Sequence, residues 1–145
     1  MHGTRFKRLL NRSLGLACVL GVFGWQTGVA QQVQQAPAAV AKPVLTQALP
    51  DLRGKEVSML TVEYPPGAVS APHRHNANTF VYVLEGSVVM QVTGGKEVTL
   101  TAGQTFYESP TDIHSVSRNA SATQPAKFLV FFIKDQGAPS NVPVK

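Results

Sequence analysis

The sequence predicts an all-β protein, built as a barrel or sandwich of short antiparallel strands. Runs rich in Val, Thr, Ile, Tyr and Phe recur along residues 57–134, and clusters of Gly, Pro, Asn and Asp separate them. No stretch of this region has the apolar period of an amphipathic helix. Two of the runs, 80–84 and 128–133, are apolar on both faces, which indicates that both faces are covered.

The expected strands follow one another in chain order. The first, at residues 57–63, ends before the Pro-Pro-Gly run at 65–67, because consecutive prolines cannot continue a central ladder. Residues 80–84 and 88–93 flank a Glu-Gly-Ser turn, and the glycines of residues 93–96 supply the positive φ that a hairpin turn needs. Further strands are expected at residues 98–100, 105–108, 113–117 and 127–134.

Residues 1–30 have the pattern of a secretory signal peptide. A basic segment precedes an apolar run at residues 14–25, and small residues precede Gln31, where cleavage is expected. The apolar run is too short to span a bilayer. We therefore expect export to the periplasm, or secretion, by the general secretory route, with no stable membrane anchor after cleavage.

The rest of the chain is expected to form one domain with flexible ends. Residues 31–48, rich in Gln, Ala and Pro and without a clean period, are expected to be a flexible lead-in. Residues 49–136 are expected to form the β-barrel domain, and residues 137–145 a flexible tail.

Charge and cysteine content exclude several classes of function. Four of the 13 basic residues and none of the 8 acidic residues lie in residues 1–30, so 9 basic and 8 acidic residues remain, a net charge of +1. No basic run of the kind that tracks phosphates is left, and nucleic acid is not an expected partner. The lone Cys18 lies in the signal segment, which leaves no disulfide and no thiol nucleophile in the mature chain.

Three histidines follow the signal segment, and their spacing indicates a metal site. His73 and His75 are two residues apart, so a β-strand points both to one face, and His114 follows about forty residues later. Imidazole binds Fe, Zn, Cu, Mn and Ni, so we expect one divalent ion of unspecified identity at His73, His75 and His114. The alternative is that the histidines are hydrogen-bonded barrel residues without a metal.

The residues around the histidines resemble the two motifs of the cupin superfamily. Gly67, His73, His75 and Gly86 match the first motif, G-x5-H-x-H-x3-E-x6-G, but Thr79 stands where it has glutamate. Residues 103–119 resemble the second motif, G-x5-P-x-G-x2-H-x3-N, with the glycine-to-histidine spacing intact. The departures there are Ser109 and Thr111 for its proline and glycine, a proline one place late at Pro110, and Asn119 one place past the asparagine.

The resemblance covers about residues 60–134 and implies a small single-domain cupin. Its fold is a double-stranded β-helix, or jelly-roll barrel, in which the three histidines form the metal site. Strand parity places Thr79, Val81 and Val83 behind these histidines, as a pocket with a polar mouth over an apolar floor. Asn78, in the loop after the clamp, is a further candidate for contact with a substrate.

Glu108 is the candidate catalytic residue. It is the acidic residue close to the second motif that can face inward, where it would serve as a fourth ligand or as a general base. The alternative is an outward-pointing charge on the strand.

The resemblance extends to cupins with three-histidine iron sites, such as thiol and diketone dioxygenases, whose substrates bind as anions. This implies a dioxygenase-type oxidoreductase acting on a small anionic molecule. A zinc-type hydrolase or isomerase and a non-catalytic module that binds a small ligand or a metal remain alternatives. The two-sided apolar strands predict a homodimer, with the N-terminal segment as the alternative cover.

Overall fold

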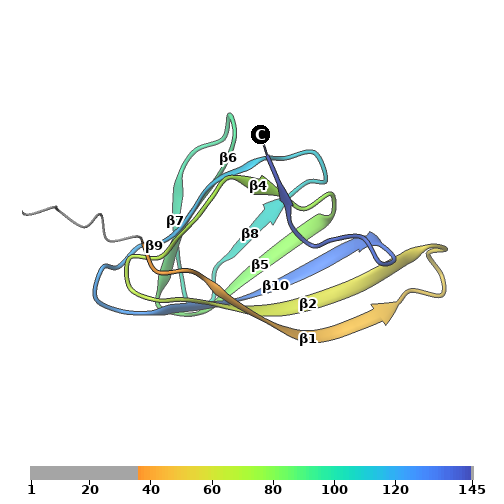
Figure 1. The fold of residues 1–145 in the computed structure, drawn as a ribbon, viewed down its shortest axis with the longest axis horizontal. Helices are drawn as coiled ribbons and strands as arrows, with labels where there is room; N and C mark the ends of the chain where they lie inside the picture. Colours follow the sequence, from red (N-terminus) through yellow and green to blue (C-terminus); the bar gives the residue numbers. More distant parts are fainter. Residues whose placement is uncertain (1–35, 145) are drawn as a thin grey trace, which may run out of the picture. The chain divides into compact units, whose positions relative to one another are not determined.

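The computed structural model describes residues 36–144, which form two packed antiparallel sheets (Figure 1). The predicted all-β class is confirmed, and these residues contain no helix. The first sheet has the order β1 (Val40–Ala48), β2 (Lys55–Tyr64), β10 (Ala126–Asp135), β5 (Asn78–Glu85) and β8 (Thr105–Glu108). The second has the order β11 (Val142–Pro143), β4 (His73–Arg74), β9 (His114–Asn119), β6 (Ser87–Val92) and β7 (Val98–Thr101), and β3 (Val69–Ser70) also pairs with β9.

The core lies between the two sheets and follows strand alternation. On β5, Thr79, Val81 and Val83 are at most 2% exposed, whereas Phe80 and Tyr82 on the other face are 42% and 46% exposed. The alternate residues of β10 and β6 complete the core, because side chains two apart point to the same face. Its members include Phe128, Val130, Phe132, Val88 and Met90.

Both expected flexible segments contain strands. Residues 40–48 form β1, which pairs with β2 along the edge of the first sheet, so the expected lead-in at 31–48 is wrong for this part. Because β1 is exposed on both faces, its sequence has no apolar alternation to signal a strand. The register shifts between Pro43 and Leu45, which fits a proline that cannot donate to a ladder.

At the other end, Val142 and Pro143 form β11 and pair with Arg74 and His73 of β4, which corrects the expected tail at 137–145. Before this segment, the buried Lys134 forms an ion pair with the partly buried Glu56, and the Lys134 ammonium also donates to the Ala138 carbonyl at 2.7 Å. The second contact connects the end of β10 to the segment that leads into β11. The predicted signal peptide, residues 1–30, lies outside the described residues. Within residues 36–144 nothing has the helical length and hydropathy that a membrane crossing requires.

A β-bulge explains the late asparagine of the second motif. Between Val92 and Gln91 of β6 the partner on β9 advances from His114 to Val116, so β9 carries one extra residue there. The extra residue returns Asn119 to the buried face that His114 occupies. The Asn119 amide donates to the carbonyls of Tyr64, Pro65 and Gln124 at 2.8–3.1 Å.

Gly86, the last residue of the first motif, is required by its backbone angle and by its neighbours. It lies between β5 and β6 with φ of 69°, and a Cβ there would sit 2.5 Å from the Pro125 carbonyl oxygen. Gly94 also has a positive φ, 82°, but a Cβ there would meet nothing within 4 Å. Substitutions at the two glycines therefore separate two free-energy costs. Both positions share the cost of the left-handed backbone angle, and only Gly86 has the cost of steric overlap.

We expect Gly86→Ala to destabilise the protein more than Gly94→Ala. The second substitution should lower the free energy of unfolding by about 1–2 kcal/mol, the cost of a left-handed backbone. The first should lose a further amount of about 1–3 kcal/mol, because backbone atoms must shift. Urea unfolding of both variants measures the difference, and equal losses would contradict this account of Gly86.

Candidate metal centre

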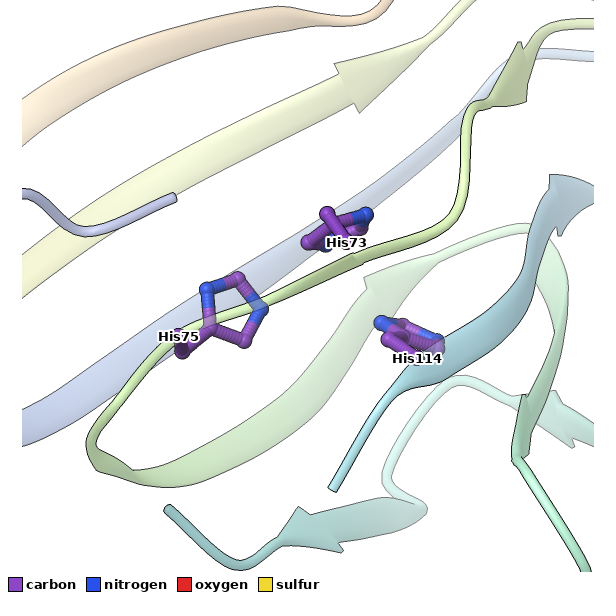
Figure 2. A group of neighbouring side chains, drawn as sticks. All are labelled: His73, His75 and His114. Carbon is purple, nitrogen blue, oxygen red and sulfur yellow. The ribbon is translucent and has the colours of Figure 1, made fainter. Parts of the chain in front are cut away.

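The fold brings the three predicted histidines together. His73 on β4 pairs directly with His114 on β9, and His75 follows β4 with its ring on the same side (Figure 2). One ligand atom from each ring lies within 4.8 Å of the others. Two nitrogens on the same ion lie at most about 4.2 Å apart at ordinary bond lengths. Any pair of nitrogens farther apart than that must move closer for one ion to bind both.

Backbone hydrogen bonds fix which nitrogen two of the rings present. The Nδ1–H of His73 donates to the Ala71 carbonyl at 2.8 Å. The Nδ1–H of His75 donates to the Ser140 carbonyl at 2.5 Å, from the segment that leads into β11. With Nδ1 protonated in both rings, each Nε2 carries a lone pair. Metal-binding histidines are commonly oriented by such a bond.

Glu108 points into the same space from the end of β8. One carboxylate oxygen lies 3.3 Å from Nδ1 of His114 and the other lies 3.7 Å from Nε2 of His75. The Glu108 side chain is 2% exposed. Within the described residues, both of its oxygens and both ring nitrogens of His114 are buried without a hydrogen-bond partner. The structure thus places Glu108 inward, in contact distance of two of the histidines.

Burial sets the protonation of this cluster when no metal is bound. Desolvation, together with the charge of His73, lowers the pKa of His75 to about 4, and that of His114, which His75 also affects, to about 3. Desolvation and the nearby Asp112 raise the pKa of Glu108 to about 8. The two imidazoles are therefore neutral at pH 7 and have lone pairs available.

The cluster fits a divalent cation. A cation would satisfy the orphaned Glu108 oxygens and the one His114 nitrogen that carries a lone pair, together with the Nε2 atoms of His73 and His75. The three imidazoles, with the nearby carboxylate, are groups that suit Zn, Fe, Mn, Ni or Cu.

A cavity of about 170 Å³ adjoins the cluster and is mainly apolar. Its walls include Leu60, Val81, Met90, Phe128, Val130 and Phe132, with the three histidines and Glu108 also lining it. Val81 was expected there. The other three expected pocket residues do not line this cavity. Val83 is in the core, Thr79 is fully buried beside Glu108 on the neighbouring strand, and the Asn78 side chain accepts a hydrogen bond from Tyr107 at 2.7 Å.

The cavity also contains a hydroxyl cluster that the sequence analysis missed. The Tyr64 hydroxyl lies 2.6 Å from the Ser70 hydroxyl and 2.7 Å from the Ser117 hydroxyl, and all three residues line the cavity. The signal that could have found Tyr64 is parity, because it lies two residues after Val62 on the buried face of β2. Ser140, whose carbonyl orients His75, lies in a segment expected to be a flexible tail. Nothing in the sequence marked it as part of the site.

Comparison with known proteins supports the family resemblance. A family model described as a cupin domain matches residues 60–132, which is half of the chain. No curated protein matches the chain.

Several solved structures share the fold at low sequence identity. A cupin domain from Bordetella pertussis has a TM-score of 0.54 and 22% identity, with 69% of this chain and 97% of that chain covered. The cupin domain of an XRE family transcriptional regulator from Enterobacter cloacae has a TM-score of 0.52 and 26% identity, covering 68% and 97%. The DMSP lyase DddQ from Ruegeria pomeroyi has a TM-score of 0.52 and 20% identity, covering 57% and 41%.

We expect Glu108→Gln to change how the stability of metal-free protein depends on pH. Between pH 4.5 and about 8 the folded protein keeps a proton on Glu108 that the unfolded chain releases, so stability falls as pH rises through this window. The glutamine variant should not lose stability in this way, because its side chain does not titrate. The lowered pKa values of His75 and His114 act below pH 6.5 and are common to both proteins.

Melting temperatures measured with a chelator from pH 5 to 9 test this expectation. The variant should gain stability relative to the native protein as pH rises toward 8. Glu85→Gln, at an exposed position, is the control and should follow the native curve. Parallel curves for Glu108→Gln and the native protein would show that the carboxyl group is not held neutral by burial.

Proposed function

The chain belongs to the cupin domain family, and from this premise we propose that it is an exported, metal-dependent enzyme acting on a small anionic molecule. Dioxygenase-type oxidation is the leading reaction class. The observation that supports the proposal is the convergence of three imidazoles and a buried carboxylate at the wall of a small apolar cavity.

His73, His75 and His114 would hold the ion. A bound divalent ion would supply a positive centre for a chelating substrate and, when redox-active, a site for reaction with O2. If Glu108 is ionised, the ion and the carboxylate together carry +1, which still attracts an anion. The apolar walls exclude water, and the hydroxyls of Tyr64, Ser70 and Ser117 provide polar contacts inside the cavity.

The size and lining of the cavity limit the kinds of substrate that can bind. A space of about 170 Å³ accepts only a small molecule or one end of a larger one. Its apolar walls favour a compact substrate whose charge is confined to the chelating group. In a dioxygenase reaction both atoms of O2 enter such a substrate, so no separate reductant is required.

One observation favours a second reaction class. Glu108 is buried beside the histidines with a raised pKa, as expected of a group that accepts a proton and later returns it. With zinc bound, that arrangement supports hydrolysis or isomerisation. Cupins that bind a small ligand or a metal without catalysis form the third possibility.

Protein purified from the periplasmic fraction of the native host tests the proposal. Export predicts an N-terminus at Gln31, and the oxygenase predicts about one iron per chain. We expect O2 uptake with a small β-diketonate probe and, with labelled O2, two labelled atoms in the product. His114→Ala is the control and should lose both metal and uptake. Zinc without O2 uptake would favour hydrolysis or isomerisation, and absence of metal would favour the binding module.

We also propose a homodimer formed through the outer face of the first sheet. Phe80, Tyr82, Leu84 and Tyr107 are 38–50% exposed there, although they are large and apolar or aromatic. Phe80 lies 5.2 Å from Tyr107 and 6.0 Å from Phe131 between ring centroids, so these rings form one continuous patch. No described residue covers this patch. A contiguous exposed apolar patch favours contact with a partner, and a symmetric dimer is the commonest arrangement.

Sedimentation tests the dimer. The mature chain should sediment as a dimer at micromolar concentration, and Phe80→Glu should give a monomer because it buries a charge in the contact. Thr99→Glu, at an exposed position on β7 of the other sheet, is the control and should leave the dimer intact. A monomeric native chain would remove this part of the proposal.

A further inference from the structure

Thr79 stands where the first cupin motif has its glutamate. Thr79 is fully buried on the inner face of β5, and its hydroxyl donates to the Ala77 carbonyl at 3.4 Å. A threonine hydroxyl is a weaker metal donor than a carboxylate and brings no negative charge. The strand that would normally supply the carboxylate therefore supplies none here.

The neighbouring strand carries a carboxylate at the same level. In the register between β5 and β8, Thr79 pairs with Glu108. Residues directly opposite in an antiparallel pair have Cβ atoms about 4.5–5.5 Å apart, so side chains from either position reach the same space. Both residues point into the core, where Thr79 is 0% and Glu108 1% exposed.

The contacts of Glu108 require either a proton or a cation between the carboxylate and the histidines. The Nδ1–H of His75 donates to Ser140, so its Nε2 is an acceptor. This Nε2 faces a Glu108 oxygen, also an acceptor, at 3.7 Å. Two acceptors that face each other in a buried site repel unless a proton or a cation lies between them. The second oxygen, 3.3 Å from Nδ1 of His114, is likewise without a hydrogen bond.

We propose that Glu108 is the fourth protein ligand of the metal centre, supplied from β8 in place of the missing carboxylate on β5. Thr79 is then the small residue that leaves room for the Glu108 carboxylate across the strand pair. This inference rests on the metal-binding part of the proposed function and adds the donor that sets the net charge of the centre.

The rival role is a positioning one, in which Glu108 accepts a hydrogen bond from Nδ1–H of His114 and acts on the metal only through that ring. The two roles predict different responses to exchange of the residues. A ligand can be supplied from either member of the cross-strand pair. An acceptor that orients His114 must stay where it is, because its distance to Nδ1 depends on its own strand.

Reciprocal exchange between the two strands tests the assignment. Affinities for Zn²⁺ and Co²⁺ are measured by competition with a chromophoric chelator in the native protein, Glu108→Thr, Glu108→Gln and the double variant Thr79→Glu with Glu108→Thr. We expect Glu108→Thr and Glu108→Gln to weaken binding by about 100-fold or more, since loss of a ligand should cost at least as much as loss of a group that only orients one. The double variant should regain affinity to within about tenfold of native.

The visible absorption of bound Co²⁺ gives a second readout, because it should change in the single variants and return toward native in the double variant. Glu85→Gln, at an exposed position, is the control. Affinities unchanged by both single substitutions would overturn the proposal. A loss that the folded double variant fails to restore would also overturn it, since it would assign Glu108 to positioning His114.

If the double variant does not fold, Glu108→Gln decides the question. Glutamine keeps an oxygen that can accept from Nδ1–H of His114 but loses the charge of a ligand. Weak binding by a Glu108→Gln variant that still unfolds in one cooperative transition supports the ligand role, and native-like binding rejects it. Failure of the native protein to bind either ion would instead reject the metal-dependent function itself.

Discussion

The main constraint on this structure is a buried cluster in which hydrogen-bond acceptors face one another. The Nε2 of His75 faces the carboxylate of Glu108. Within the described residues, neither ring nitrogen of His114 has a hydrogen-bond partner. A fold that keeps such a cluster incurs a desolvation cost that hydrogen bonds elsewhere do not recover. A bound cation removes that cost at one position, and the protonation of Glu108 relieves part of it when no metal is present.

Strands from both sheets and both ends of the domain build this cluster. The short β4 lies between β9 and β11, so that His73 is held beside His114, and the segment before β11 supplies the carbonyl that orients His75. The first sheet contributes Glu108 through β8 and the apolar floor through β2, β5 and β10. The site is thus formed by the pairing of strands in the folded protein. The groups that orient its histidines come from segments far apart in the sequence.

The sequence predicted the parts of the site that depend on local spacing. The HxH spacing and strand parity place His73 and His75 together, and the same parity puts Val81 on the pocket side. It could not predict features that depend on register. The pairing of Thr79 with Glu108 is set by how β5 and β8 align, and the burial of Asn119 depends on a bulge. Edge strands such as β1 carry no alternation, because no face of them is buried.

The central claim is that His73, His75 and His114 bind one divalent ion. X-ray absorption of protein loaded with one equivalent of zinc measures this most directly, because the fine structure reports the type, number and distance of the ligands. We predict three imidazole nitrogens and an oxygen donor at about 2.0–2.2 Å from the ion. Fewer than three imidazoles in the coordination shell, or zinc that remains fully hydrated, would contradict the claim.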